Sequence, residues 1–159
     1  MNKAVFFDRD GVINREIGNY VCSTETFELL PDAIETMKAA SEKGYLVFVI
    51  TNQGGIAKGL YTHSILSDIH GILLKACNEA GVVITEIFYC PHHPVSSNCI
   101  CRKPDSLMLE KAIAKYNISP GASWMIGDTE RDSGAAARAG VRSYMIQSNE
   151  SKKAFIEML

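Results

Sequence analysis

The sequence has no long apolar run, no cluster of basic residues and no low-complexity tract. No apolar stretch approaches the roughly 20 residues that a membrane-spanning helix needs, and the first residues lack the pattern of a secretory signal. The formal net charge of -2 offers no electrostatic attraction to nucleic acid. We therefore expect a cytoplasmic protein that binds neither membranes nor nucleic acid.

The chain is also too short for two independent cores. Its 159 residues, 47% hydrophobic and 21% charged, are ordinary for one soluble globular domain. We expect a single domain over residues 1–159, and nothing in the sequence demands more than a monomer. The chain has five cysteines, which in a reducing compartment favour bound metal or free thiols over disulfides.

The hydrophobic pattern alternates between the periods of strands and helices. Strands are predicted at 4–7, 46–50, 84–89, 124–126 and 141–146, and helices at 31–43, 62–81, 107–116, 131–139 and 152–159. Such alternation is typical of βαβ units and predicts an α/β fold, a single Rossmann-like domain with a parallel sheet and helices on both faces. The chain between Asp10 and Thr51 is too short for a separate cap domain, so we expect an open site.

The most informative motif is Asp8-Arg9-Asp10-Gly11, which directly follows the first predicted strand. Side chains alternate along an extended chain, so we expect Asp8 and Asp10 to point the same way and Arg9 to point away. Two such carboxylates repel each other unless a cation lies between them, and Mg2+ would also attract phosphate oxygens. The alternative for this short motif alone is a solvated turn.

Polar residues directly follow four of the predicted strands: Asp8 and Asp10, Thr51 and Asn52, Cys90, and Gly127 and Asp128. Ligands of parallel α/β sheets bind beyond the carboxyl ends of the strands, so these residues predict one polar site. In that site Asp8 would attack a phosphorus atom and form an aspartyl-phosphate. Asp10 would protonate the leaving alkoxide and then take a proton from the hydrolytic water.

Further residues would complete this chemistry. Thr51 offers a hydroxyl and Lys103 a compact positive charge for the phosphoryl oxygens. Asp128, with Asp132 four residues on, would hold Mg2+, which neutralises developing charge. His63 and His70 lack a partner pattern, and we expect both on a helix surface, with Cys77 in the core.

The loop of residues 90–101 contains a full set of zinc ligands, namely Cys90, His92, Cys99 and Cys101. Four ligands leave no open position for substrate, so this spacing predicts a structural zinc-bound loop. Because Arg102 and Lys103 follow directly, zinc would also fix where these two cations point. The alternative is a polar loop without metal.

The order of these motifs resembles the haloacid dehalogenase superfamily of phosphatases. The matching segments are Asp8-Arg9-Asp10-Gly11-Val12, Thr51-Asn52-Gln53, Lys103-Pro104 and Gly127-Asp128 with Asp132. The resemblance implies that Asp8 is the nucleophile, Asp10 the acid and base, and that Thr51 and Lys103 stabilise the phosphoryl group. It also implies Mg2+ ligands from Asp8, Asp128 and the backbone carbonyl of Asp10.

The zinc loop resembles a subgroup of phosphatases that act on D-glycero-D-manno-heptose 1,7-bisphosphate or on histidinol phosphate. The stretches 19–21, 51–59 and 89–94 favour the heptose substrate, whereas the short segment between His92 and Cys99 favours histidinol phosphate. The heptose resemblance implies that Arg102 contacts the distal C1 phosphate. It also implies further substrate contacts from Glu16, Tyr20, Asn52 and Gln53. We expect removal of the C7 phosphate in the biosynthesis of nucleotide-activated heptose, a lipopolysaccharide core precursor, with histidinol phosphate as the alternative.

Two non-enzymatic functions are also conceivable. A phospho-receiver domain has adjacent acidic residues and an acceptor aspartate on a later strand, which the spacing of Asp8 and Asp10 contradicts. A zinc-binding interaction module without activity would not need every catalytic position filled. We therefore favour a Mg2+-dependent phosphatase.

Overall fold

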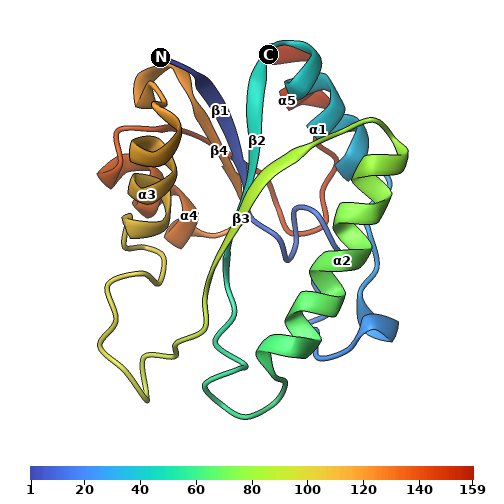
Figure 1. Cartoon of the computed structure of the whole chain (residues 1–159), viewed down its shortest axis with the longest axis vertical. Coiled ribbons are helices and arrows are strands. Elements are labelled where there is room, and N and C mark those ends of the chain that lie inside the picture. Colours follow the sequence, from blue (N-terminus) through green and yellow to red (C-terminus); the bar gives the residue numbers. More distant parts are fainter.

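Five parallel strands form the centre of the molecule, in the order β3-β2-β1-β4-β5 (Figure 1). The computed structural model describes residues 1–159. The strands are β1 (Lys3–Phe7), β2 (Tyr45–Asn52), β3 (Ile84–Cys90), β4 (Trp124–Gly127) and β5 (Arg142–Met145). The five strands predicted from the hydrophobic pattern are thus confirmed, with β2 longer and β5 shorter than expected.

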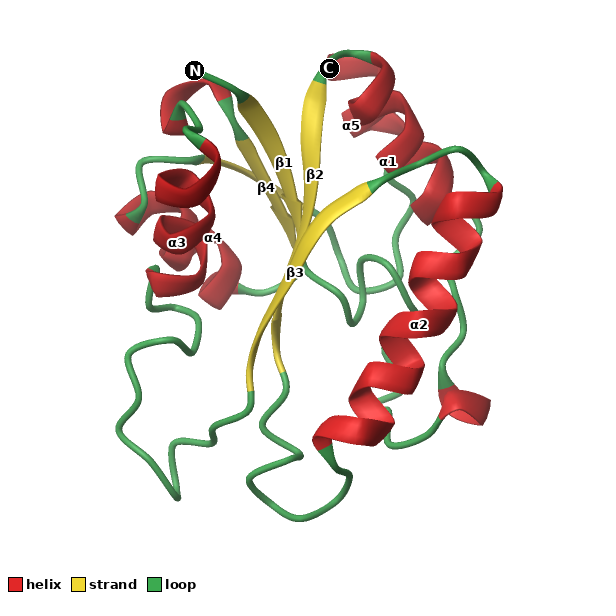
Figure 2. Cartoon of the chain, viewed as in Figure 1, coloured by secondary structure: helices red, strands yellow, loops and turns green.

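Five α-helices cover the two faces of this sheet (Figure 2). They are α1 (Ala33–Glu42), α2 (His63–Glu79), α3 (Leu107–Tyr116), α4 (Glu130–Arg138) and α5 (Lys153–Met158), with short 3-10 helices at Thr24–Thr26 and Pro120–Ala122. Helices α1, α2 and α5 lie on one face, and α3 and α4 lie on the other. None of these helices combines the length and apolar character that crossing a membrane requires.

The central strand β1 supplies both hydrophobic cores. Val5 and Phe7 belong to the core beneath α1, α2 and α5, whereas Ala4 and Phe6 belong to the core beneath α3 and α4. All four side chains are buried, and burying a phenylalanine such as Phe6 contributes about 1.5–3 kcal/mol. Because both faces are covered, the strand is a continuous apolar run rather than an alternating one.

The connections at the carboxyl ends of the strands are loops, without a separate cap domain. Residues 8–32 contain only one 3-10 helix, and residues 91–106 contain neither helix nor strand. Thr62 caps α2 as expected, because its hydroxyl accepts a hydrogen bond from the Ile65 amide at 3.2 Å. No separate domain consequently lies over the carboxyl ends of the strands.

Candidate active site

The carboxyl ends of β1, β2 and β4 border a largely polar cavity of about 480 Å³. Its lining contains nine of the predicted site residues: Asp8, Asp10, Glu16, Tyr20, Asn52, Gln53, Arg102, Lys103 and Asp128. Of the remaining predictions, Thr51 lies buried beside Gln53, and Asp132 lies buried beneath Lys103. The sheet therefore brings together residues from five separate parts of the chain.

Lys103 lies between two aspartates at the floor of this cavity. Its Nζ is 2.7 Å from Asp8 Oδ1 and 2.6 Å from Asp132 Oδ1, and it donates to the Ile50 carbonyl at 2.8 Å. Burial disfavours the charged amine, but the two carboxylates outweigh that effect and raise the pKa of Lys103. The ammonium therefore stays charged where a phosphoryl group would approach Asp8.

Asp132 binds Lys103 and the start of α4. Its Oδ1 pairs with Lys103, and its Oδ2 accepts hydrogen bonds from the amide and hydroxyl of Thr129, which caps α4. The Asp132 side chain is fully buried. Asp132 thus acts on Lys103 and on the start of α4, and it does not line the cavity alongside Asp128.

Asp8 has one engaged and one available carboxylate oxygen. Oδ1 accepts from Lys103 Nζ and from the Arg9 amide at 2.7 Å, while no donor is bonded to Oδ2. Burial raises the pKa of Asp8 to about 7, against the opposing effect of Lys103. The available oxygen is the one suited to nucleophilic attack.

A buried hydrogen-bond network holds Asp10. Arg9 Nη2 lies 2.9 and 3.1 Å from the two Asp10 oxygens, and the amide groups of Asn14 and Gln53 donate at 3.0 and 3.1 Å. Burial alone would raise the pKa of Asp10, but the Arg9 charge and these donors hold it below its ordinary value. The expectation that Arg9 points away from the aspartates is wrong, since its guanidinium is buried against Asp10.

The position of His70 also differs from the one predicted. It was expected on a helix surface, yet it is only 7% exposed and its Nε2 lies 3.4 Å from Arg9 Nη1. Burial and the Arg9 charge lower the pKa of His70 to about 4. A neutral His70 can accept a hydrogen bond from Arg9, which explains its place in the core. His63 is exposed as expected, and Cys77 is buried as expected.

The residues at the carboxyl end of β2 and directly after it connect the two halves of the site. Gln53 Nε2 donates to both Thr51 Oγ1, at 2.9 Å, and Asp10. Asn52 exchanges two hydrogen bonds with the backbone of Lys103, at 3.0 and 3.1 Å. This segment therefore fixes Asp10 on one side and Lys103 on the other.

Asp128 approaches the turn after Asp10 very closely. A Cβ atom at Gly11, whose φ is +82°, would collide with the Asp128 carboxylate, so only glycine fits there. Asp128 Oδ2 accepts a hydrogen bond from Ser148, and burial raises the pKa of Asp128. The carboxylates of Asp8, Asp128 and Asp132 lie within 4.8 Å of one another. The single positive charge of Lys103 does not neutralise these three carboxylates. Their oxygen atoms are the ligands that a hard divalent cation prefers.

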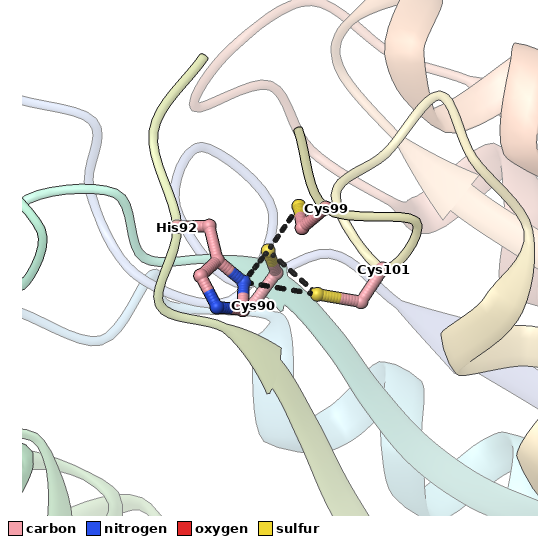
Figure 3. A group of neighbouring side chains, drawn as sticks. All are labelled: Cys90, His92, Cys99 and Cys101. Atoms are coloured by element: carbon pink, nitrogen blue, oxygen red, sulfur yellow. Dashed lines mark hydrogen bonds between the residues drawn. The ribbon is translucent and has the colours of Figure 1, made fainter. Parts of the chain in front are cut away.

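The four predicted zinc ligands converge in the loop between β3 and α3 (Figure 3). The Cys90 sulfur lies 3.6 Å from Cys99 Sγ and 3.0 Å from Cys101 Sγ, and His92 Nδ1 lies 3.3 Å from Cys101 Sγ. All five cysteines are free thiols. In a tetrahedron with Zn–S bonds of about 2.3 Å, neighbouring sulfurs are roughly 3.8 Å apart. The cluster is slightly tighter than that, and its donor set fits zinc.

The sequence analysis assigned no individual role to several residues of the cavity. These are Gly18, Asn19, Val21, Gly54, Thr129, Arg131 and Ser148. Gly54 lets Arg102 approach, because a Cβ atom there would lie 3.1 Å from Arg102 Nη1. Arg131 is exposed and forms no ion pair, so it adds a free cation to the cavity. The only feature of the sequence that could have placed Arg131 in the site is its position two residues after Thr129, at the start of α4.

The parallel sheet and the two aspartates at the end of its central strand define a hydrolase of the HAD-like class. A family model described as HAD-hydrolase-like matches residues 100–157. A curated D-glycero-alpha-D-manno-heptose-1,7-bisphosphate 7-phosphatase from Photorhabdus laumondii is 41% identical over 155 residues, which cover 91% of this chain and 82% of the relative. A curated D-glycero-beta-D-manno-heptose-1,7-bisphosphate 7-phosphatase from Haemophilus ducreyi is 37% identical, and the match covers 91% of this chain and 82% of the relative.

A solved structure agrees with these relatives. The D,D-heptose 1,7-bisphosphate phosphatase from B. bronchiseptica, complexed with magnesium and phosphate, superimposes with a TM-score of 0.88. It is 32% identical, and the match covers 98% of this chain and 86% of that one. The chain belongs to the family of D-glycero-D-manno-heptose-1,7-bisphosphate 7-phosphatases.

Proposed function

We propose that the protein removes the C7 phosphate of D-glycero-D-manno-heptose 1,7-bisphosphate through an aspartyl-phosphate on Asp8. The observation that carries this proposal is one open polar cavity that holds the Asp8–Lys103 pair together with Arg102, a second cation. A substrate with phosphates at both ends needs positive charge at both ends. The relatives at 41% and 37% identity bear the name of this activity.

In the proposed reaction, Asp8 Oδ2 forms a bond to phosphorus as the bond from phosphorus to the sugar oxygen breaks. Lys103 and the Arg9 amide hold Asp8 Oδ1, so the carboxylate is fixed while its other oxygen attacks. Asp10 gives a proton to the leaving sugar oxygen, and the negative charge of the bound phosphate favours its protonation. Asp10 then takes a proton from the water that hydrolyses the aspartyl-phosphate.

Two metals fit this mechanism. Asp8, Asp128 and the Asp10 backbone carbonyl would hold Mg2+, which neutralises charge on the phosphoryl oxygens when bound. Cys90, His92, Cys99 and Cys101 would hold zinc as a structural ion. We further propose a monomer, and a cytoplasmic location because free cysteines and a thiolate metal site suit a reducing compartment.

The test compares phosphate release with Mg2+ from both anomers of the heptose bisphosphate and from histidinol phosphate. We expect kcat/KM for one heptose anomer to exceed that for histidinol phosphate by at least 100-fold, because only the bisphosphate engages the distal cation. A preference for histidinol phosphate would overturn the assignment, and the short zinc loop would then be the better guide to substrate.

We predict that Arg102→Ala raises KM for the heptose bisphosphate on the order of tenfold and leaves KM for a small monophosphate nearly unchanged. The guanidinium donates to the His92 carbonyl at 3.1 Å, so the zinc loop directs it into the cavity. Steady-state kinetics on the two substrates measure the difference. Arg138→Ala, which removes an exposed arginine paired with Asp105 outside the cavity, is the matched control. Equal effects on both substrates would mean that Arg102 does not contact the distal phosphate.

A further inference from the structure

The segment that follows β5, near the carboxyl end of the chain, contacts residues next to the site. Asn149 donates its backbone amide to the Gly11 carbonyl at 2.8 Å. Its side chain forms a two-way pair with Glu16: Oδ1 accepts from the Glu16 amide at 2.7 Å, and Nδ2 donates to the Glu16 carbonyl at 3.0 Å. One asparagine therefore contacts both the turn after Asp10 and the start of the loop of residues 16–21.

The loop of residues 16–21 is held by the buried side chain of Val21, by the packing of Tyr20 against Gly55, and by these hydrogen bonds with Asn149. Its other hydrogen bonds are local, from the Gly18 amide to the Glu16 carboxylate and from the Tyr20 amide to Asn19, and from the Cys22 thiol to the Tyr20 carbonyl. The two bonds from Asn149 are the only ones that connect the loop to a distant part of the chain. Five residues of this loop line the cavity, so its position shapes one wall of the site.

The Asn149 backbone adopts a conformation that suits this role. Its φ is +67°, in the left-handed region that asparagine tolerates better than most residues other than glycine. Asn117 is the only other residue besides glycine with positive φ, at +49°, and its side chain forms no hydrogen bond. Glycine would satisfy the backbone at either position, but only at 149 would it remove side-chain contacts.

The segment that carries Asn149 is anchored independently of the loop. Lys152 is fully buried, and its Nζ lies 2.6 Å from Asp32 Oδ1 at the start of α1. Asp32 also accepts hydrogen bonds from the Lys152 amide at 2.5 Å and from the Ser151 hydroxyl at 2.9 Å. Asn149 is thus held in place by its own segment, and its side chain ties the loop of residues 16–21 to that segment.

We propose that Asn149 is a positioning residue for substrate recognition, which holds the loop of residues 16–21 where Glu16 and Tyr20 can meet the sugar. The role rests on the proposed function, because it concerns the sugar part of the substrate. Asn149 does not line the cavity or contact Asp8, Asp10 or Lys103. It should therefore affect binding of the sugar and leave phosphoryl chemistry alone.

The test is Asn149→Gly, which keeps the left-handed backbone and removes only the two side-chain bonds. We expect KM for the heptose bisphosphate to rise about tenfold, with kcat changed less than twofold. The kcat/KM for p-nitrophenyl phosphate, which has no sugar, should stay within twofold of wild type. Hydrogen exchange of the amides of residues 16–21 should accelerate about tenfold. Asn117→Gly, the same substitution at the other positive-φ asparagine, should change none of these.

The outcomes separate this inference from the proposed function. If wild type does not prefer the heptose bisphosphate, the proposed function fails, and hydrogen exchange alone still tests the link between Asn149 and the loop. An unchanged KM and unchanged exchange in Asn149→Gly would overturn the inference, as would equal losses on both substrates. Asn149→Asp is the second variant should the first not fold, because it keeps the acceptor for the Glu16 amide. It should raise KM by less than Asn149→Gly, and a wild-type KM would again overturn the inference.

Discussion

Asp8→Asn should lower kcat for phosphate release by a factor on the order of 10^4 or more while the protein stays folded. The amide differs from the carboxylate in charge and not in shape, so its oxygen can still accept from Lys103 and from the Arg9 amide. What is lost is the negatively charged Oδ2 that would attack phosphorus. Binding and electrostatic stabilisation by Lys103 would remain, and they account for any residual rate.

The measurement is single-turnover phosphate release, together with far-UV circular dichroism to establish that the variant is folded. Asp105→Asn is the control, since Asp105 is an aspartate on the surface that pairs with Arg138. A near-wild-type rate in folded Asp8→Asn would rule out Asp8 as the nucleophile. Incubation of wild type with substrate and rapid acid quenching should also trap a phosphorylated aspartate that the variant cannot form.

The sheet and most of the site could be predicted from the sequence because the signals were local. An apolar run followed directly by a polar residue indicates the end of a buried strand. Strands β1 and β4 end directly before Asp8 and Asp128, whereas β2 extends through Thr51 to Asn52 and β3 extends to Cys90. Parallel strands place their carboxyl ends at one edge, so convergence followed from the strand assignments alone. The convergence of Cys90, His92, Cys99 and Cys101 could also be predicted, because their spacing within one loop is short.

The parts that could not be predicted depend on long-range contacts. Alternation along a strand places Arg9 opposite the aspartates, but the chain turns at Gly11, and the Arg9 guanidinium reaches Asp10 instead. His70 lies 61 residues away from Arg9 in the sequence. Asn149 is separated from Glu16 by 133 residues. The hydrophobic pattern or motif of a single segment cannot predict contacts between residues so far apart in the sequence. Each of these contacts affects the site through a residue that the motifs did identify.

Loss of zinc should have the second large effect, because little else orders the loop between β3 and α3. Between residues 91 and 106 only Lys103 is buried, and the loop has no helix or strand. Its shape would therefore depend on four ligands around one zinc ion, and structural zinc sites contribute on the order of 10 kcal/mol in small zinc domains. Since Cys101 precedes Arg102 and Lys103, disorder in this loop would displace both cations.

We expect about one zinc per chain after dialysis, and none in Cys99→Ser. The variant should lose at least tenfold in kcat/KM for the heptose bisphosphate, because Lys103 must reach both Asp8 and Asp132 at hydrogen-bond distance. Elemental analysis and steady-state kinetics measure the two quantities. Cys22→Ser, which changes a half-buried cysteine outside the cluster, should retain zinc and activity. Freshly purified wild type without zinc would contradict the metal assignment, whereas full activity in zinc-free Cys99→Ser would show that the loop positions Lys103 without the ion.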